Sequence, residues 1–462
     1  MQKNDHLTLT VERLSGDFSG IAQADGLVTF IPFALPGETV AAHVLSVKKR
    51  HAFAKAERIE HFSPDRVAPK CPLFGRCGGC ACQHLDYPKQ LETKRQHVAD
   101  CFSRLNALPV AVAPVTPSPI SYRYRNKAAM PVGQAADGRL FAGFYAPRSH
   151  RLLAVTDCPL VDDHVNRAVR HALEWLNAAR VSAYDEATGR GLIRHIVTRV
   201  NRAGFVMLSL VLNGDRLPDE AGFIDHMRAL PGLVSLNVIA NKRRDNVILG
   251  DTARTLWGKP YLEETLLGTA FRLSPLSFFQ VNTAQAERLF QTALDVSGVT
   301  RDDTVADVYC GTGTLSLLFA KKVKRVRGIE IVAPAIDNAR NNARLNGVDN
   351  AFFHVGAAED VLPALVNDGY APSVVLLDPP RKGVDQKVLD AILFCGAAKI
   401  VYISCYPATQ ARDCAYLAAH GFKVAACQPV DMFPQTEHVE TVVLMLKSVN
   451  PEGKSHSERP ME

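Results

Sequence analysis

The stretch that decides the fold is VADVYCGTGTLSLLFA, residues 305–320. Its first part, Val305–Tyr309, reads as a buried strand, and the loop CGTGT (310–314) follows it directly. The apolar run Leu315–Ala320 then reads as a helix. Glycines at such a junction let the backbone turn sharply and approach a ligand closely at the end of a strand. The stretch therefore predicts a strand–loop–helix unit with a binding site at its loop.

Strands and helices continue to alternate beyond this unit. Short apolar runs at Val326–Ile331, Val374–Leu377 and Lys399–Ile403 are separated by helical stretches, and a last strand is expected at Thr441–Leu446. Alternation of this kind indicates a parallel, doubly wound sheet. The sequence therefore predicts a Rossmann-like α/β domain in the C-terminal part of the chain.

Two acidic residues favour S-adenosylmethionine as the ligand of the glycine loop. Glu330 ends the strand after the loop, where a carboxylate can accept hydrogen bonds from both hydroxyls of a ribose. Asp307 suits an ammonium group, and the loop lacks the additional glycines or the Lys-Ser/Thr pair typical of phosphate binding. S-adenosylmethionine is thus favoured over a dinucleotide. The alternative without a ligand is a tight strand–helix turn.

The segment DPPRKG (378–383) follows the predicted strand Val374–Leu377 directly. In an open α/β sheet this position is the crevice in which ligands bind, and the prolines restrict the backbone that carries Asp378. Enzymes that methylate amino groups often have an aromatic residue after such prolines, which stacks on the target base. Arg381 occupies that position here, which argues against N-methylation.

A cysteine at the same expected edge of the sheet is a candidate nucleophile. Cys405 lies beside a turn at the carboxyl end of a predicted strand, whereas a cysteine in mid-strand would be ordinary packing. Thiolate addition at C6 of uracil would make C5 nucleophilic enough to take a methyl group, and a base must then remove the C5 proton. Glu437, His438 and Glu440 precede the last strand, and spacing alone does not choose among them.

Four of the eleven cysteines lie close together in the N-terminal quarter of the chain. In a reducing compartment such a cluster indicates a metal site rather than disulfides. Cys71, Cys77 and Cys80 have the spacing Cys-x5-Cys-x2-Cys, and Cys82 or Cys158 would be the fourth ligand. Cys158 is favoured, because Cys82 is too close in sequence to reach round the site. The spacing allows structural zinc, which is slightly favoured, or an iron–sulfur cluster.

The N-terminal half has two further patterns that bear on nucleic-acid binding. Residues 7–60 alternate apolar and polar positions between glycine-containing breaks, which predicts a small β-barrel. Its basic edge at 48–55 is either a nucleic-acid contact or a solvated strand end. After a helical stretch, Tyr87–Leu105, the segment Tyr122–Lys127 interleaves aromatic and basic residues. Such a segment can stack bases and neutralise phosphates, although a solvent-facing strand would look the same.

The bulk properties set wide limits on function. A chain of 462 residues has room for about two to four domains. The net charge of +6 is compatible with a nucleic-acid partner without requiring one. No apolar run is long enough to span a bilayer, and the N-terminus lacks the apolar segment of a signal peptide. We therefore expect a cytoplasmic monomer without a membrane partner.

Five motifs follow one another between residues 279 and 440. They are Phe279-Gln280-Val281-Asn282, the Asp-x-x-Cys-Gly-x-Gly loop from Asp307, Asp378-Pro-Pro-Arg381, Ser404-Cys405-x-Pro, and the Asp-x-Phe-Pro-x-Thr-x-His-x-Glu run ending at Glu440. Together they resemble the RNA uracil-C5 methyltransferase family. The resemblance implies that Cys405 is the nucleophile and Glu440 the base. It implies S-adenosylmethionine contacts at Gln280, Tyr309, Gly311, Gly313, Thr314 (where a relative has Asn), Glu330 and Asp378.

The resemblance also extends to the N-terminal half. The branch of the family that acts on ribosomal RNA carries a four-iron (4Fe-4S) cluster on the same pattern, which implies that Cys71, Cys77, Cys80 and Cys158 hold one here. The first sixty residues resemble a TRAM domain, a β-barrel that binds RNA. The branch of the family that acts on tRNA lacks both the TRAM domain and the cluster. Their joint presence implies that the substrate is 23S ribosomal RNA, at its uridine 1939. There are two alternatives. The enzyme could methylate another ribosomal RNA site or tRNA, or the protein could bind RNA without catalysis.

These expectations divide the chain into four parts: a TRAM barrel (1–62), a central α+β domain with the cluster (63–270), a Rossmann-like class I methyltransferase domain (271–447) and a disordered tail (448–462). Residues 83–120 are expected to pack against the catalytic domain. The central domain would then be discontinuous in sequence.

Overall fold

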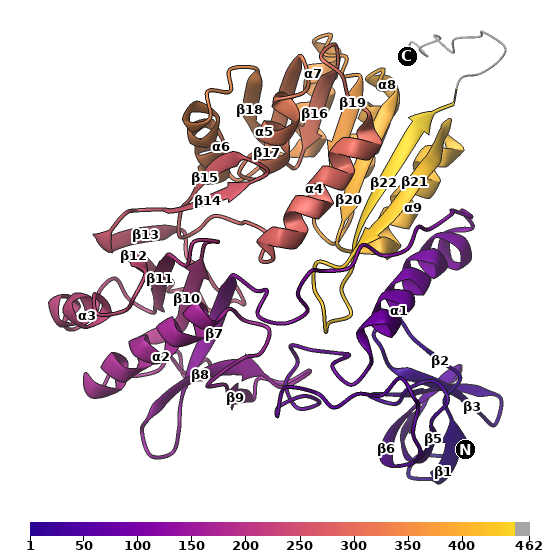
Figure 1. The fold of residues 1–462 in the computed structure, drawn as a ribbon, viewed down its shortest axis with the longest axis vertical. Coiled ribbons are helices and arrows are strands. Elements are labelled where there is room, and N and C mark those ends of the chain that lie inside the picture. The colour runs from indigo at the N-terminus through magenta and orange to yellow at the C-terminus, as the bar shows by residue number, and fades with distance from the viewer. Residues whose placement is uncertain (449–462) are drawn as a thin grey trace.

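The computed structural model describes residues 1–448 and has three sheet-containing parts (Figure 1). The tail that we expected to be disordered falls outside the described residues from position 449 onward. An N-terminal sheet and a central sheet lie on one side of a larger C-terminal α/β domain. No helix in the described range combines the length and apolarity needed to cross a bilayer.

The N-terminal part is a six-stranded sheet with the order β1-β5-β6-β4-β3-β2. Its strands are β1 (His6–Thr10), β2 (Arg13–Leu14), β3 (Gly20–Ala24), β4 (Leu27–Ile31), β5 (Thr39–Val47) and β6 (His51–His61). Alternate side chains of β5 are buried, and they meet apolar residues of β1 and β4 in a small core. The alternation of apolar and polar residues thus predicted these strands correctly.

A helix links this sheet to the C-terminal domain. Helix α1 (Tyr87–Asp100), with Pro88 in its first turn, continues into a π-helical turn, η1 (Cys101–Leu105). Val98 and Phe102 belong to the same buried cluster as Tyr402 of the C-terminal sheet. The segment that follows the N-terminal sheet therefore packs into the C-terminal core.

The central part is a seven-stranded sheet with the order β13-β12-β11-β10-β7-β8-β9 and two helices on one face (Figure 1). Its elements are β7 (Lys127–Gln134), β8 (Leu140–Tyr145), β9 (Leu152–Ala154), α2 (Asp163–Ala178), β10 (Ile193–Val200), β11 (Val206–Leu212), α3 (Glu220–Met227), β12 (Leu233–Ala240) and β13 (Thr252–Gly258). The hairpin of β14 (Leu262–Leu266) and β15 (Thr269–Leu273) packs with helix α4 in the C-terminal core. The C-terminal unit therefore begins before residue 271.

The C-terminal sheet has the order β18-β17-β16-β19-β20-β22-β21, with helices on both faces. Strands β16 to β20 are parallel to one another, and β22 runs antiparallel between β20 and β21. The elements are α4 (Thr283–Ser297), β16 (Thr304–Val308), α5 (Thr314–Ala320), β17 (Arg325–Glu330), α6 (Ala333–Leu345), β18 (Ala351–Val355), α7 (Ala358–Asn367), β19 (Val374–Leu377), α8 (Gln386–Phe394), β20 (Lys399–Ser404), α9 (Pro407–Ala419), β21 (Phe422–Val430) and β22 (Glu440–Lys447). The predicted doubly wound α/β domain is confirmed.

Candidate active site

Four of the predicted site residues lie at the ends of four adjacent parallel strands. Glu330 ends β17, while Tyr309, Asp378 and Cys405 directly follow β16, β19 and β20. These strands are neighbours in the order β17-β16-β19-β20. Because the carboxyl ends of parallel strands meet at one edge, the structure brings these residues together in the ligand-binding crevice of the fold.

The glycine loop turns sharply at this edge. Tyr309, Gly311 and Gly313 all have left-handed backbones, with φ angles of 80°, 55° and 79°. A Cβ atom at position 313 would lie 2.9 Å from the Cβ of Ala339, so a larger residue would push the loop away from α6. At Gly311 the equivalent space is open. Thr314 begins α5 at the end of the loop. The loop therefore leaves room for a ligand above Gly311.

The Glu330 carboxylate is held in place by the backbone. Its two oxygens accept hydrogen bonds from the N–H groups of Gly311 (3.1 Å) and Val332 (2.9 Å), which leaves further lone pairs for hydroxyl donors. Beyond it, Ile331 and Val332 are more than half exposed and offer an apolar surface. A ribose at Glu330 with its base over these residues would match this chemistry.

Gln280, a predicted cofactor residue, lies in the segment between β15 and α4. Its backbone carbonyl accepts a hydrogen bond from the side chain of Asn126 (3.1 Å), and the Asn126 N–H donates to Val281 (2.8 Å). Among residues 1–448, the side-chain amide of Gln280 makes no hydrogen bond and is therefore available to a ligand. The central part of the chain thus supports a predicted cofactor residue.

The structure buries Asp307, the residue predicted to receive an ammonium group. Its carboxylate is fully enclosed below the loop, where one oxygen accepts a hydrogen bond from the Ser316 hydroxyl at 2.6 Å. Burial raises the pKa of Asp307 to about 6. The Ser316 bond ties β16 to the first turn of α5. The other carboxylate oxygen of Asp307 is buried and has no hydrogen-bond partner in the described part of the chain.

The pairing of β20 with β22 brings Cys405 and Glu440 together. Ser404 is paired with Thr441, so continuing this antiparallel register by one residue sets Cys405 opposite Glu440. Burial, with a smaller contribution from the nearby Asp378 carboxylate, raises the pKa of the Glu440 carboxyl to about 8. Burial also raises the pKa of the Cys405 thiol, and Glu440 adds to this rise. The thiol and the carboxyl are therefore close enough to interact.

Arg381 is a site residue that the sequence reasoning used only as an argument against N-methylation. Its guanidinium lowers the pKa of both Cys405 and Glu440, against the larger effect of burial. Its Nη2 also lies 3.3 Å from Nε2 of His438. The signal was present, because the residue after Asp378-Pro-Pro must lie at the same strand edge as the thiol.

The structure separates the three candidate bases. Burial, together with the positive charge of Arg381, lowers the pKa of His438 to about 4, so this imidazole is neutral and weakly basic. The Glu437 side chain is exposed. Its pKa is raised mainly by partial desolvation and also by the carboxylate of Asp17, which lies in the turn between β2 and β3. Glu440 is 4% exposed and lies across from Cys405. Glu440 is therefore the candidate base that the geometry favours.

The aromatic and basic segment Tyr122–Lys127 is largely engaged within the protein. The Tyr124 side chain is buried, and its hydroxyl donates to the carbonyl of Pro434 at 3.0 Å. Arg123 makes two hydrogen bonds of 2.7 Å to the Asp157 carboxylate. These side chains are thus not free to stack on bases or to neutralise phosphates, and this part of the segment does not meet the RNA-contact expectation.

The four cysteines named from spacing gather at one place in the central part. Burial, together with smaller contributions from the thiols of Cys158, Cys77 and Cys71, raises the pKa of the Cys80 thiol to about 12, which shows that the four thiols are neighbours. Cys82 lies apart, because its buried thiol points to the carbonyl of Thr436 at 3.6 Å. An all-sulfur donor set of this kind fits a bound cation that would stabilise the thiolates, either zinc or an iron–sulfur cluster.

Comparisons with known proteins agree with this architecture. The family model for tRNA (uracil-5-)-methyltransferases matches residues 232–448, and the TRAM domain model matches residues 2–56. An uncharacterised RNA methyltransferase of Listeria monocytogenes (serotype 4b, strain F2365) is 43% identical over 446 residues, covering 96% of this chain and 98% of the relative. One from Halalkalibacterium halodurans is 41% identical over 452 residues, covering 97% and 98%.

A solved structure is similar over nearly the whole chain. It is the Pyrococcus abyssi tRNA (uracil-54, C5)-methyltransferase in complex with S-adenosyl-L-homocysteine, with 28% identity, a TM-score of 0.76, and coverage of 95% of this chain and 100% of that one. Coverage this complete includes most of the N-terminal sheet. The expectation that tRNA-acting relatives lack the barrel is therefore wrong for this enzyme, and the barrel does not distinguish ribosomal RNA from tRNA substrates.

The two family models agree with the relatives that match over nearly their whole length, and both agree with the site at the edge of the C-terminal sheet. The TRAM domain and the methyltransferase domain indicate an RNA substrate, and the similar structure binds the demethylated form of S-adenosylmethionine. The chain belongs to the S-adenosylmethionine-dependent RNA uracil-C5 methyltransferase family.

Proposed function

We propose that this protein converts uridine to 5-methyluridine in RNA through a covalent adduct between Cys405 and C6 of the base. The observation that carries the proposal is the pairing of Ser404 with Thr441, which places the next residues, Cys405 and the buried Glu440, near one another, with Arg381 near both. A thiol beside a carboxyl and a cation supplies a nucleophile, a base and a positive charge that stabilises anions.

Each group has a defined task in the proposed reaction. The Cys405 thiolate adds to C6 of uracil, and the electrons of the C5–C6 double bond move toward C5 and O4 to give an enolate. S-adenosylmethionine supplies the methyl group, which C5 attacks as the sulfonium bond breaks. Glu440 then takes the C5 proton, the double bond re-forms, and the C6–S bond breaks to release the thiolate. Arg381 stabilises the thiolate before attack and after release.

The rate of methylation should rise with pH across about pH 8. Cys405 and Glu440 both act in their deprotonated forms, and both have raised pKa values, about 8 for Glu440. Lowering the pH below these pKa values therefore protonates both groups and removes activity. Replacing Arg381 with Gln should shift the profile to higher pH, because the arginine lowers both values. Multiple-turnover formation of free methylated RNA between pH 6 and pH 9 measures this, because it includes both thiolate attack and proton removal, and a flat profile would contradict the assignment.

We propose 23S ribosomal RNA as the substrate, on the resemblance of the cysteine pattern to the ribosomal branch of the family. tRNA is a second candidate, because the similar Pyrococcus abyssi enzyme is described as acting on uracil 54 of tRNA. Transcripts of both RNAs can be incubated with labelled S-adenosylmethionine and digested to nucleosides. The proposal expects labelled 5-methyluridine from the ribosomal transcript. Label in tRNA alone would overturn the substrate, and label in another nucleoside would overturn the reaction.

We further propose that Cys71, Cys77, Cys80 and Cys158 hold a 4Fe-4S cluster, with zinc as the alternative. The cluster would shape the protein without taking part in methyl transfer. Protein purified without air should contain iron and sulfide and be brown. Cys158→Ser should lose most of the metal, whereas Cys82→Ser should retain it, because the Cys82 thiol points to Thr436. A colourless protein that contains zinc would contradict the iron–sulfur assignment.

A further inference from the structure

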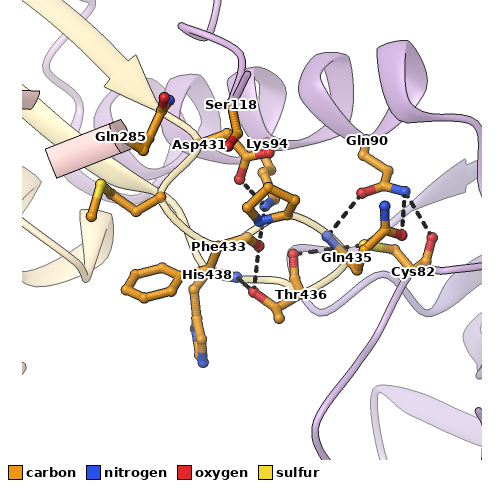
Figure 2. A network of polar contacts seen from close by, with 12 residues as sticks. Cys82, Gln90, Lys94, Ser118, Gln285, Asp431, Phe433, Gln435, Thr436 and His438 are labelled. Carbon is orange, nitrogen blue, oxygen red and sulfur yellow. Dashed lines mark hydrogen bonds and ion pairs between the residues drawn. The ribbon is translucent and has the colours of Figure 1, made fainter. Parts of the chain in front are cut away.

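The proposed base lies at the neck of a long hairpin loop. Strand β21 ends at Val430, which is paired with Glu440 at the start of β22. The residues between them, 431–439, form the loop shown in Figure 2. Asp431 is therefore the first residue beyond the pair that contains Glu440, and whatever holds Asp431 also holds the neck. We call residues 431–439 the base loop.

A lysine from α1 is buried against this neck. The Lys94 ammonium donates to the Asp431 carboxylate at 2.6 Å and to the carbonyl of Phe433 at 3.1 Å. Both charged side chains are fully buried, and the other Asp431 oxygen accepts a hydrogen bond from the Tyr87 hydroxyl at 2.8 Å. Burying the ammonium and the carboxylate removes their hydration, which costs free energy. Their mutual attraction compensates for this cost only when the two groups are held at hydrogen-bonding distance and orientation. The pair therefore ties α1 to the base loop with directional bonds.

The rest of the base loop is held from the same side (Figure 2). Gln90, one helical turn before Lys94, exchanges hydrogen bonds with the side chain and backbone of Gln435. The backbone N–H groups of Ala81 and Cys82 donate to the Gln435 carbonyl at 3.0 and 3.3 Å. At the far limb of the loop, His438 meets Arg381. The loop thus connects α1 to both charged groups that flank Cys405.

We propose that Lys94 is a positioning residue for Glu440: by binding Asp431 and the Phe433 carbonyl, it holds the neck of the base loop so that the Glu440 carboxyl faces the methylated carbon. The inference rests on the proposed function. Its specific consequence concerns one step. Glu440 acts after methyl transfer, so a displaced neck should slow proton removal and RNA release more than it slows formation of the methylated adduct.

The test separates these steps in a single turnover with uridine-containing RNA and labelled S-adenosylmethionine. Methylated RNA linked to protein and free methylated RNA are quantified over time. Lys94→Met should release RNA roughly tenfold to a hundredfold more slowly, because small displacements of catalytic groups have effects of that size. The matched control is Lys89→Met, since Lys89 lies on the same helix with its ammonium exposed and paired to Glu92. It should behave like the wild type.

A second variant covers the case in which Lys94→Met alone does not fold. Lys94→Met/Asp431→Leu replaces the ion pair with apolar groups of similar volume, which commonly preserves stability. It removes the directional bonds to the neck, so it should fold and still release RNA slowly. Release at the wild-type rate by a folded single or double variant would overturn the positioning role. A wild-type protein that forms no RNA-linked species would overturn the proposed function, and this inference with it.

Discussion

Replacing Cys405 with alanine is expected to abolish RNA methylation while leaving S-adenosylmethionine binding almost unchanged. The thiol is the only proposed route to a nucleophilic C5, so its loss should reduce the rate by a factor on the order of 10⁴ or more. The proposed cofactor residues Gly311, in the loop after β16, and Glu330, at the end of the neighbouring strand β17, keep their mutual hydrogen bond. Labelled methyl incorporation measures the rate, and calorimetry with S-adenosylmethionine measures binding.

Cys395→Ala is the matched control for this experiment. Cys395 is another cysteine of the C-terminal domain, but it is buried and follows α8, at the opposite edge of the sheet from the crevice. Its removal should leave methylation near the wild-type level. Substantial methylation by Cys405→Ala, with the control intact, would contradict the covalent mechanism.

Replacing Glu440 with glutamine is expected to leave methyl transfer possible and to stop the release of RNA. The amide occupies the same place opposite Cys405 but cannot accept the C5 proton, so the methylated adduct cannot eliminate the thiolate. A slowly migrating protein–RNA band should accumulate to about one equivalent per enzyme under denaturing electrophoresis. Turnover should fall by a factor on the order of 10² to 10⁴.

Glu437→Gln is the control, because Glu437 belongs to the same loop but is exposed and faces Asp17. It should turn over without a trapped band. If Glu440→Gln turned over normally and Glu437→Gln accumulated the adduct, the assignment of the base would be reversed.

The sequence could predict that the site residues lie close together, because the carboxyl ends of parallel strands lie at the same edge of the sheet. Each of Glu330, Asp378 and Cys405 ends or follows an apolar run, so a doubly wound sheet brings them together without knowledge of long-range contacts. The glycine loop was recognisable for a similar reason, since a short local stretch determines its backbone. These parts of the site depend on local pattern and one topological rule.

Other parts depend on burial and on contacts between distant segments. Sequence spacing does not decide whether His438 or Glu440 is the base. The choice depends on which of the two side chains lies near Cys405 and which is kept uncharged by burial. The bond between Lys94 and Asp431 joins residues 337 positions apart, with no local signal in either segment. Tyr124 looked like a base-stacking residue, yet its hydroxyl is bound to the Pro434 carbonyl inside the protein. Only the tertiary structure supplies such facts.

The most direct test of a thiol-linked intermediate uses RNA in which 5-fluorouridine replaces uridine. Fluorine cannot leave C5 as a proton does, so the methylated adduct should persist after reaction with S-adenosylmethionine. Proteolysis and mass spectrometry should then find a nucleotide carrying both fluorine and the transferred methyl group on the peptide that contains Cys405. A linkage at another residue, or no linkage from a preparation that methylates ordinary RNA at full speed, would contradict the mechanism.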